Sequence, residues 1–137
     1  MHKYLIVIFV MVFVVLVLIS SRVHPQKGII RLSSRDAFDI FEKNKGKDDF
    51  VVLDIRTPDE FNAGHIDGAV LIDYYGTDFA DKLNVLDKNK TYLVYCRSGN
   101  RSRSALPLFE KLGFSKVYEI EHGIKSWIKA GYTTYVK

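Results

Sequence analysis

The chain has 137 residues, which is enough for one domain with its own core and a short additional segment. Its net charge of +4 is modest, and its basic residues are scattered without interleaved aromatic side chains, so the composition gives no sign of a nucleic-acid interface. One cysteine and four scattered histidines exclude an internal disulfide and the usual zinc-binding spacings, and we expect neither a metal nor a cofactor.

The chain begins with an apolar run, because residues 4–19 carry no charge and are almost all aliphatic or aromatic. Such a run is typical of the apolar region of a signal peptide or of a membrane anchor. With Ser20 and Ser21 it is just long enough to cross a bilayer as a helix, which takes about 20 residues. No clear small-x-small cleavage site follows, so the sequence favours an uncleaved anchor over a cleaved signal peptide.

This run sets the predicted domain organisation. We expect a signal peptide or anchor helix at residues 1–21, a linker at 22–28 and the folded domain at 29–137. Lys3 favours an amino end inside the cell, whereas the basic residues after the run favour the reverse. A short basic start before an apolar run is typical of exported proteins. The sequence therefore predicts membrane association through residues 4–21, with the domain outside the cytoplasm.

Strands alternate with helices along the rest of the chain. Apolar runs rich in β-branched residues predict strands at 28–32, 50–56, 70–72, 92–95 and 116–120. Helical spacing predicts helices at 36–45, from Thr57 onward, within 73–86 and at 101–113. Ser33 or Ser34 is expected to cap the first of these helices, and Thr57 the second. The alternation predicts an α/β domain with a mostly parallel central sheet and helices on both faces.

The lone cysteine, Cys96, lies where the strand at 92–95 runs into the helix at 101–113. Such a loop lies at the carboxyl end of the sheet, where open α/β folds bind ligands. The backbone N–H groups of a glycine-containing turn, the opening helix and the nearby Arg97 and Arg101 all favour a negative charge on the cysteine. The thiolate is the nucleophilic form, so we expect a reactive Cys96 rather than a buried apolar one.

Three stretches resemble the rhodanese (sulfurtransferase) family, and together they cover about residues 30–131. They are the loop Cys96-Arg97-Ser98-Gly99-Asn100-Arg101-Ser102; then Asp54-x-Arg56, Glu60-Phe61 and Gly64-His65-Ile66-x-Gly68-Ala69; and Glu121-His122-Gly123-Ile124-x-x-Trp127. Two positions depart from the family pattern. Asp67 stands where many members have proline, and His122 replaces the first glycine of a Gly-Gly pair. If His122 needs a positive φ, it adopts it at some cost.

The resemblance implies a rhodanese-like fold and a two-step sulfur transfer. The Cys96 thiolate takes the outer sulfur of a small anion such as thiosulfate as a persulfide, and a thiol or a cyanide-like acceptor then removes it. The residues expected to bind substrate are Arg97, Ser98, Gly99, Asn100, Arg101 and Ser102. Their backbone amides would hold the persulfide, and Arg97 and Arg101 the oxyanion of the donor. Ser98 stands where rhodaneses that use thiosulfate often carry another cation, so the donor stays open.

Two alternatives share this site. The domain could be a membrane-tethered persulfide carrier or sensor that serves a partner protein. It could also be a cysteine-based phosphatase or arsenate reductase, but tyrosine-phosphatase loops place five residues between cysteine and arginine. Here four residues separate Cys96 from Arg101, which leaves a loop too small for a phosphoryl group.

Other polar residues near these motifs have structural explanations. Asp54 and Arg56 are expected to brace the end of their strand rather than to tune Cys96. His65 lies in a glycine-rich turn and is expected to make structural hydrogen bonds. His122 either borders the pocket or is a surface turn residue, and the sequence favours neither.

Overall fold

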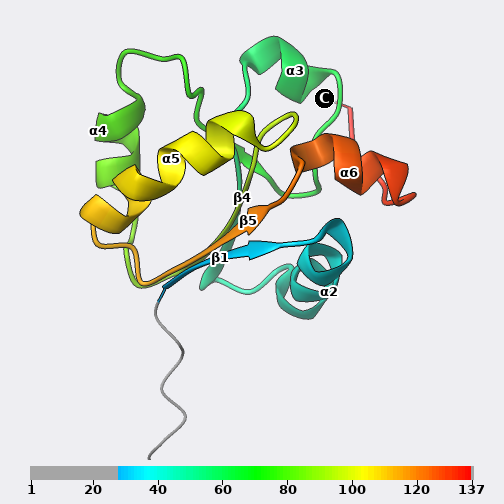
Figure 1. Cartoon of the computed structure of the whole chain (residues 1–137), viewed down its shortest axis with the longest axis horizontal. Coiled ribbons are helices and arrows are strands. Elements are labelled where there is room, and N and C mark those ends of the chain that lie inside the picture. Colours follow the sequence, from blue (N-terminus) through cyan, green and yellow to red (C-terminus); the bar gives the residue numbers. More distant parts are fainter. Residues whose placement is uncertain (1–27, 137) are drawn as a thin grey trace, which may run out of the picture.

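The computed structural model describes residues 28–136, which form a five-stranded parallel sheet with strand order β1-β5-β4-β2-β3 (Figure 1). The strands are β1 (Gly28–Leu32), β2 (Phe50–Asp54), β3 (Val70–Leu71), β4 (Thr91–Tyr95) and β5 (Lys116–Ile120). The helices are α2 (Ser34–Asn44), α3 (Pro58–Asn62), α4 (Phe79–Asn84), α5 (Asn100–Lys111) and α6 (Gly123–Lys129). The sheet and its crossover helices confirm the predicted α/β architecture.

The predicted anchor helix at residues 1–21 and nearly all of the predicted linker lie outside the described residues. Gly28, placed in the linker by the sequence, is the first residue of β1. Within residues 28–136, no helix is both long enough and apolar enough to span a bilayer.

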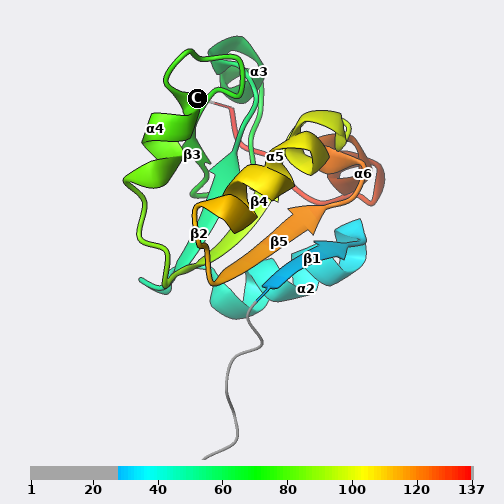
Figure 2. The same ribbon diagram turned by 60° about the vertical axis from the view of Figure 1, so that its left-hand side comes forward.

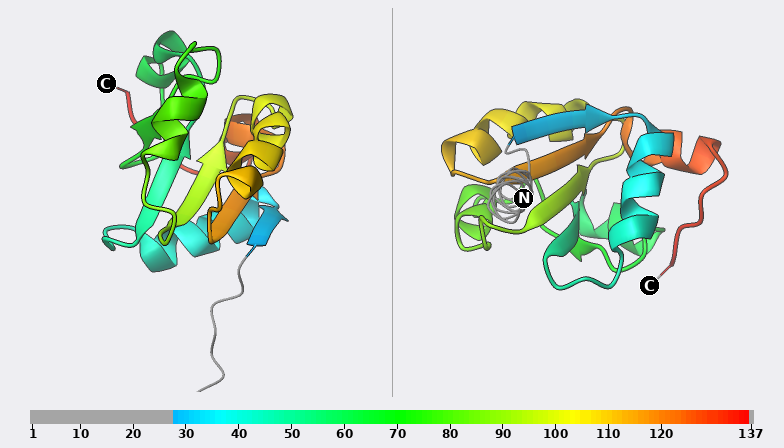
Figure 3. Two further views of the ribbon diagram at one scale, coloured as in Figure 1. Left: turned by 90° about the vertical axis from the view of Figure 1, so that its left-hand side faces the viewer. Right: turned by 90° about the horizontal axis from the view of Figure 1, so that it is seen from below.

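The two faces of the sheet are covered by different helices, as Figures 2 and 3 show for α5 and α2. On one face, buried side chains of α4 and α5 such as Leu83 and Phe109 pack on the sheet. On the other face, Phe41 of α2 and Trp127 of α6 pack together. Burial of apolar area on both faces stabilises the central strands, which explains why β4 is an uninterrupted apolar run.

The helix starts form as their sequences dictate. Ser33 caps α2 by accepting a hydrogen bond from the Asp36 N–H, with an N–Oγ distance of 3.2 Å. Thr57 caps α3 in a full capping box, in which Glu60 reaches back to the Thr57 N–H. Pro58 occupies the first turn of α3, where its missing N–H costs no hydrogen bond. The predictions at both caps are confirmed.

Several element boundaries differ from the prediction. The second strand ends at Asp54 rather than at 56, because the Asp54 carboxylate accepts the Arg56 N–H at 2.9 Å and turns the chain. The Cys96 helix begins at Asn100 and ends at Lys111, followed by Gly113 in a left-handed conformation.

The buried face of α5 differs in part from the one that helical spacing predicts, which is Ala105, Leu108, Phe109 and Leu112. Ala105 and Phe109 are buried as predicted, together with Ser102 and Leu106, whereas Leu108 and Leu112 are only half-buried. The helix therefore turns a polar residue, Ser102, toward the sheet directly behind the Cys96 loop.

Candidate active site

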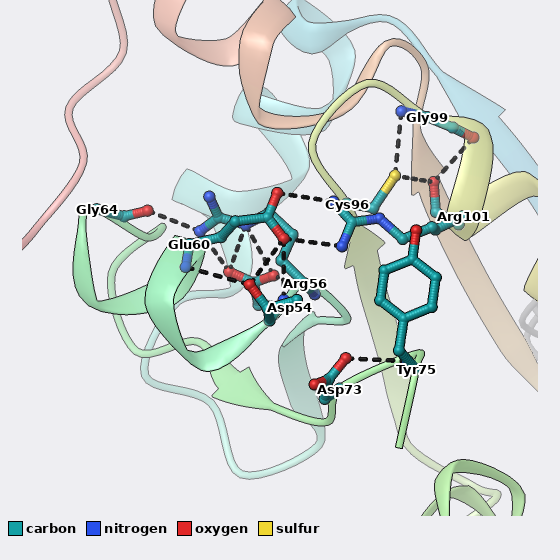
Figure 4. Close-up of polar contacts among 11 residues, drawn as sticks. Asp54, Arg56, Glu60, Gly64, Asp73, Tyr75, Cys96, Gly99 and Arg101 are labelled. Carbon is teal, nitrogen blue, oxygen red and sulfur yellow. Dashed lines mark hydrogen bonds and ion pairs between the residues drawn. The ribbon is translucent and has the colours of Figure 1, made fainter. Parts of the chain in front are cut away.

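The sulfur of Cys96 lies in the loop between β4 and α5, at the carboxyl end of the sheet (Figure 4). It accepts a hydrogen bond from the Gly99 N–H at 3.1 Å and lies 3.5 Å from the Ser102 hydroxyl oxygen. Cys96 is only 1% exposed. Because a backbone N–H donates to the sulfur and a hydroxyl lies beside it, the sulfur has polar neighbours and is not packed only among apolar side chains.

The other predicted substrate-binding residues lie in two environments. Gly99 and Ser102 are buried and contact the sulfur, whereas Arg97, Ser98 and Asn100 are exposed around the loop. Within residues 28–136, Arg97 forms no ion pair with a carboxylate. No group of three or more potential metal ligands occurs in this part of the chain.

The Cys96 loop is fixed from behind by the turn between β5 and α6. The Ile124 N–H donates to the Cys96 carbonyl at 2.9 Å, and the Lys125 N–H donates to the Arg97 carbonyl at 3.1 Å. Gly123 has a φ of 61°, and a Cβ there would lie 2.7 Å from the Arg97 carbonyl oxygen. Only glycine fits this close approach of two backbones.

His122, the residue before that glycine, also has a φ of 61°. The sequence suggested that His122 would be strained if its position required a positive φ, and the structure shows that it has one. The side chain of His122 is exposed, while its backbone N lies 2.9 Å from where a Cβ of Gly99 would be. The His122 backbone therefore packs against the Cys96 loop.

Arg101 is tied to α3 by Glu60. Its Nη1 and Nη2 donate to the two carboxylate oxygens of Glu60, each at 2.8 Å, and its guanidinium lies 5.3 Å from the ring centre of Tyr75 (Figure 4). This bidentate ion pair uses the guanidinium N–H groups that the sequence assigned to the oxyanion of a donor. Arg101 is therefore first a clamp between α3 and α5. The sequence did not predict its partner, which lies 41 residues away.

Glu60 makes the stability of the domain sensitive to acid. The Arg101 fork, with the N–H and hydroxyl of Thr57, lowers the pKa of Glu60 to about 2 from the ordinary 4.5. A lowered pKa means that its stabilisation is complete above pH 4.5 and is lost as the pH falls toward 2. We expect Glu60→Gln to lower the free energy of unfolding by roughly 2 kcal/mol near neutral pH and by little at pH 2.

Urea unfolding between pH 2 and pH 7 measures this difference. Glu42→Gln is the matched control, since it removes a carboxylate that is 42% exposed and, among residues 28–136, is paired only with Lys45. An equal loss for Glu60→Gln at both ends of the pH range would contradict the expectation.

A second pair, Asp54 and Arg56, is buried at the end of β2. Arg56 Nη2 donates to Asp54 Oδ2 at 2.6 Å and to the Gly64 carbonyl at 2.6 Å. Asp54 is 0% and Arg56 5% exposed. The pair joins the end of β2 to the turn after α3, which is the bracing arrangement that the sequence suggested, and neither side chain is hydrogen-bonded to the Cys96 sulfur.

Removing one partner of this buried pair is expected to be costly. Asp54→Ala leaves the Arg56 guanidinium buried without its counter-charge, so we expect a loss of about 3–5 kcal/mol in the free energy of unfolding. The double variant Asp54→Leu with Arg56→Met removes both charges and should recover more than half of that loss. Chemical denaturation of the three proteins measures both effects. A double variant as unstable as Asp54→Ala would contradict the assignment.

A buried carboxylate that the sequence did not single out lies beside the loop. Glu119 of β5 is 0% exposed and accepts a hydrogen bond from the Ser102 hydroxyl at 2.6 Å. Its other oxygen accepts from Arg31 Nε at 2.9 Å. The alternation of β5 places Glu119 on the face of Val117, toward α5, but nothing in the sequence shows that an acidic side chain there stays buried.

A hollow of about 290 Å³ borders the loop on the side of α3 and α6. Its lining includes three cations, Arg56, Arg97 and Lys125, one carboxylate, Glu60, and apolar side chains of α6. Arg56 is paired with Asp54 and Glu60 with Arg101, whereas Arg97 and Lys125 form no ion pair with a carboxylate within residues 28–136. The surface beside the loop therefore suits a small anion.

Comparisons with known proteins agree with this arrangement. The family model of the rhodanese-like domain matches residues 37–130. A thiosulfate sulfurtransferase, GlpE of Pseudomonas entomophila, is 42% identical over 77 residues, which are 56% of this chain and 69% of that protein.

The probable adenylyltransferase/sulfurtransferase MoeZ of Mycobacterium tuberculosis is 37% identical over 78 residues. These are 57% of this chain but only 20% of MoeZ, so the likeness covers a fifth of that protein. The crystal structure of a rhodanese-related protein from Thermoplasma volcanium superposes with a TM-score of 0.68 at 29% identity, covering 79% of this chain and 99% of that one.

Proposed function

Because the chain belongs to the family of rhodanese-like domains, we propose that it is a sulfurtransferase that carries sulfur on Cys96. The observation that carries the proposal is the setting of the Cys96 sulfur, which accepts the Gly99 N–H at the mouth of a strand-to-helix loop. The relatives named as thiosulfate sulfurtransferases support thiosulfate or a related anion as the donor.

The proposed reaction has two balanced steps. The Cys96 thiolate attacks the outer sulfur of thiosulfate; a new S–S bond forms, and the electron pair of the broken S–S bond leaves with sulfite. An acceptor such as cyanide or a thiolate then attacks the outer sulfur of the persulfide. The S–S bond formed in the first step then breaks, and its electron pair stays on the Cys96 sulfur, which becomes a thiolate again.

The surroundings suggest how the donor is held. The Gly99 N–H already points at the sulfur, so it is placed to stabilise negative charge there. Because Glu60 occupies the Arg101 fork, Arg97 and Lys125 at the edge of the hollow are the better candidates for the oxyanion end of the donor. Arg101 then acts by fixing the start of α5.

A persulfide carrier for a partner protein would use the same site, and the enzyme and the carrier differ only in turnover with free small molecules.

We further propose that residues 4–21 attach the domain to a membrane, with the domain outside the cytoplasm, on the ground of their apolar sequence. The phosphatase or arsenate reductase alternative is disfavoured by the four-residue spacing between Cys96 and Arg101.

Thiocyanate formation from thiosulfate and cyanide tests the proposal. The full chain, kept in mild detergent because of its apolar run, should turn over thiosulfate repeatedly and leave p-nitrophenyl phosphate intact. A single sulfur transferred per chain, without further turnover, would favour the carrier. Hydrolysis of the phosphate ester without thiocyanate formation would overturn the sulfurtransferase proposal.

A further inference from the structure

We propose that Glu119 is a positioning residue that holds the proton of the Ser102 hydroxyl away from the Cys96 sulfur, and so favours the sulfur-loaded form of the domain over the free thiolate. This inference rests on the proposed function for its consequence in sulfur transfer, but not for its effect on the thiol itself.

A continuous polar chain leads from the sheet edge to the sulfur. Arg31 of β1 lies opposite Glu119 of β5 in the strand register, and its Nε donates to Glu119 at 2.9 Å. The Ser102 hydroxyl donates to the other Glu119 oxygen at 2.6 Å, and its oxygen lies 3.5 Å from the Cys96 sulfur. All of this lies on the face of the sheet that α5 covers, and Ser102 and Glu119 are both 0% exposed.

Ser102 has one proton and three neighbours that could accept it. These are the Glu119 carboxylate at 2.6 Å, the Gly99 carbonyl at 3.2 Å and the Cys96 sulfur at 3.5 Å. The carboxylate is the nearest and the only one with a fixed negative charge, so it takes the proton. The serine then turns an oxygen lone pair toward the sulfur.

That lone pair acts differently on the uncharged and the charged states of the Cys96 sulfur. A protonated thiol can donate to it, and the inner sulfur of a persulfide, which carries no formal charge, tolerates it. A thiolate is repelled by it and by the buried carboxylate behind it. Loading consumes the thiolate and unloading regenerates it, so destabilising the thiolate slows unloading and makes the loaded form persist.

The charged groups around Glu119 support a fixed negative charge there. From β1, the Arg31 guanidinium contacts it, and the hydrogen bond raises the pKa of Arg31 above its ordinary value. Glu121, the first residue after β5, lies 3.9 Å from Arg31, and both side chains are partly exposed. From α5 the neutral Ser102 hydroxyl donates to Glu119, and β4 places Val94 opposite it in the strand register.

The test measures how fast a preloaded persulfide is released. The full chain is loaded with excess thiosulfate, freed of donor and mixed with cyanide, and thiocyanate is followed over a single turnover. Glu119→Gln keeps the size of the side chain and removes its charge, so the Ser102 proton becomes free to turn to the sulfur. We expect release at least about threefold faster than in the parent, since a hydrogen bond to a charged sulfur is gained.

Two further variants separate the effect of the Glu119 contact with Ser102 from the effect of a negative charge nearby. Glu121→Gln removes the same charge two residues away, without contact to Ser102, and should leave the release rate within about 1.5-fold, as expected for a partly exposed charge. Ser102→Ala should not slow release, and Glu119→Gln should give a smaller gain in that background, because only the repulsion by the carboxylate is then removed. If Ser102 instead donated to the sulfur, Ser102→Ala would slow release.

Alkylation by iodoacetamide as a function of pH tests the thiol without any sulfur chemistry. Glu119→Gln should shift the reaction of Cys96 to lower pH, and Glu121→Gln should not. This outcome would support the inference even if thiosulfate failed as a donor. An unchanged alkylation profile in Glu119→Gln, equal shifts in the two glutamate variants, or slower release in Ser102→Ala would each overturn it.

Discussion

Cys96→Ser is expected to abolish thiocyanate formation from thiosulfate and cyanide, with a fall of at least about a thousandfold to the level of the uncatalysed mixture. The serine oxygen fits the space of the sulfur and can still accept the Gly99 N–H. It cannot form a stable bond to sulfane sulfur, because a hydroxyl is a poor nucleophile without a base, and Ser102, whose hydroxyl oxygen lies 3.5 Å from this position, is not one.

Thermal unfolding is the control for this variant. Cys96 is buried among apolar residues of the α5 face, and the exchange is nearly isosteric, so the protein should remain folded. Residual turnover above a tenth of the parent rate in a folded Cys96→Ser protein would contradict the assignment of Cys96 as the sulfur carrier.

Gly123→Ala is expected to have the largest effect on the fold among single-methyl changes. A Cβ at this position would lie 2.7 Å from both the carbonyl carbon and the carbonyl oxygen of Arg97, and the neighbouring Cys96 carbonyl is in the way as well. These are backbone atoms that cannot turn aside. We expect a loss of more than about 3 kcal/mol in the free energy of unfolding, or a displaced Cys96 loop and lost sulfur transfer.

Gly113→Ala isolates the collision from the backbone strain. Gly113 has a φ of 81°, so alanine is strained there too, but its Cβ would meet nothing within 4 Å. Its cost should be about 1 kcal/mol, with sulfur transfer unchanged. Equal destabilisation by the two substitutions, measured by urea unfolding, would show that contact with the Cys96 loop does not matter.

The sequence predicted the features whose causes are local. The caps at Ser33 and Thr57 follow from side chains that reach backbone groups three residues away, and the structure forms both. The apolar run of β4 and the turn that follows it placed Cys96 at the carboxyl end of the sheet, where it lies directly after β4. Strand alternation with helices was sufficient to predict the layers.

Contacts between distant residues could not be predicted in this way. The pairing of Arg101 with Glu60 joins residues 41 apart, and that of Arg31 with Glu119 joins residues 88 apart. The sequence therefore assigned Arg101 to the donor anion, although a carboxylate already fills its fork. It also treated the residue at 119 as an ordinary strand position, because burial of a charge depends on partners from other elements.

The buried Glu119 bears on the choice between enzyme and carrier. A domain that holds its sulfur longer than a free thiolate would is suited to delivery to a chosen acceptor, whereas rapid release suits turnover with any small thiophile. The two activities form a continuum set by the stability of the Cys96 thiolate. In our proposal the contacts of Ser102, at 2.6 Å to Glu119 and 3.5 Å to the sulfur, slow the release of sulfur without abolishing repeated turnover.

The most direct test of the central claim is the intact mass of the full chain after incubation with thiosulfate and removal of the donor. We expect the parent protein to gain the mass of one sulfur atom, to lose it on addition of cyanide, and the Cys96→Ser protein to gain nothing. A parent protein that gains no sulfur from thiosulfate or from polysulfide, or a gain that survives in Cys96→Ser, would contradict sulfur transfer through Cys96.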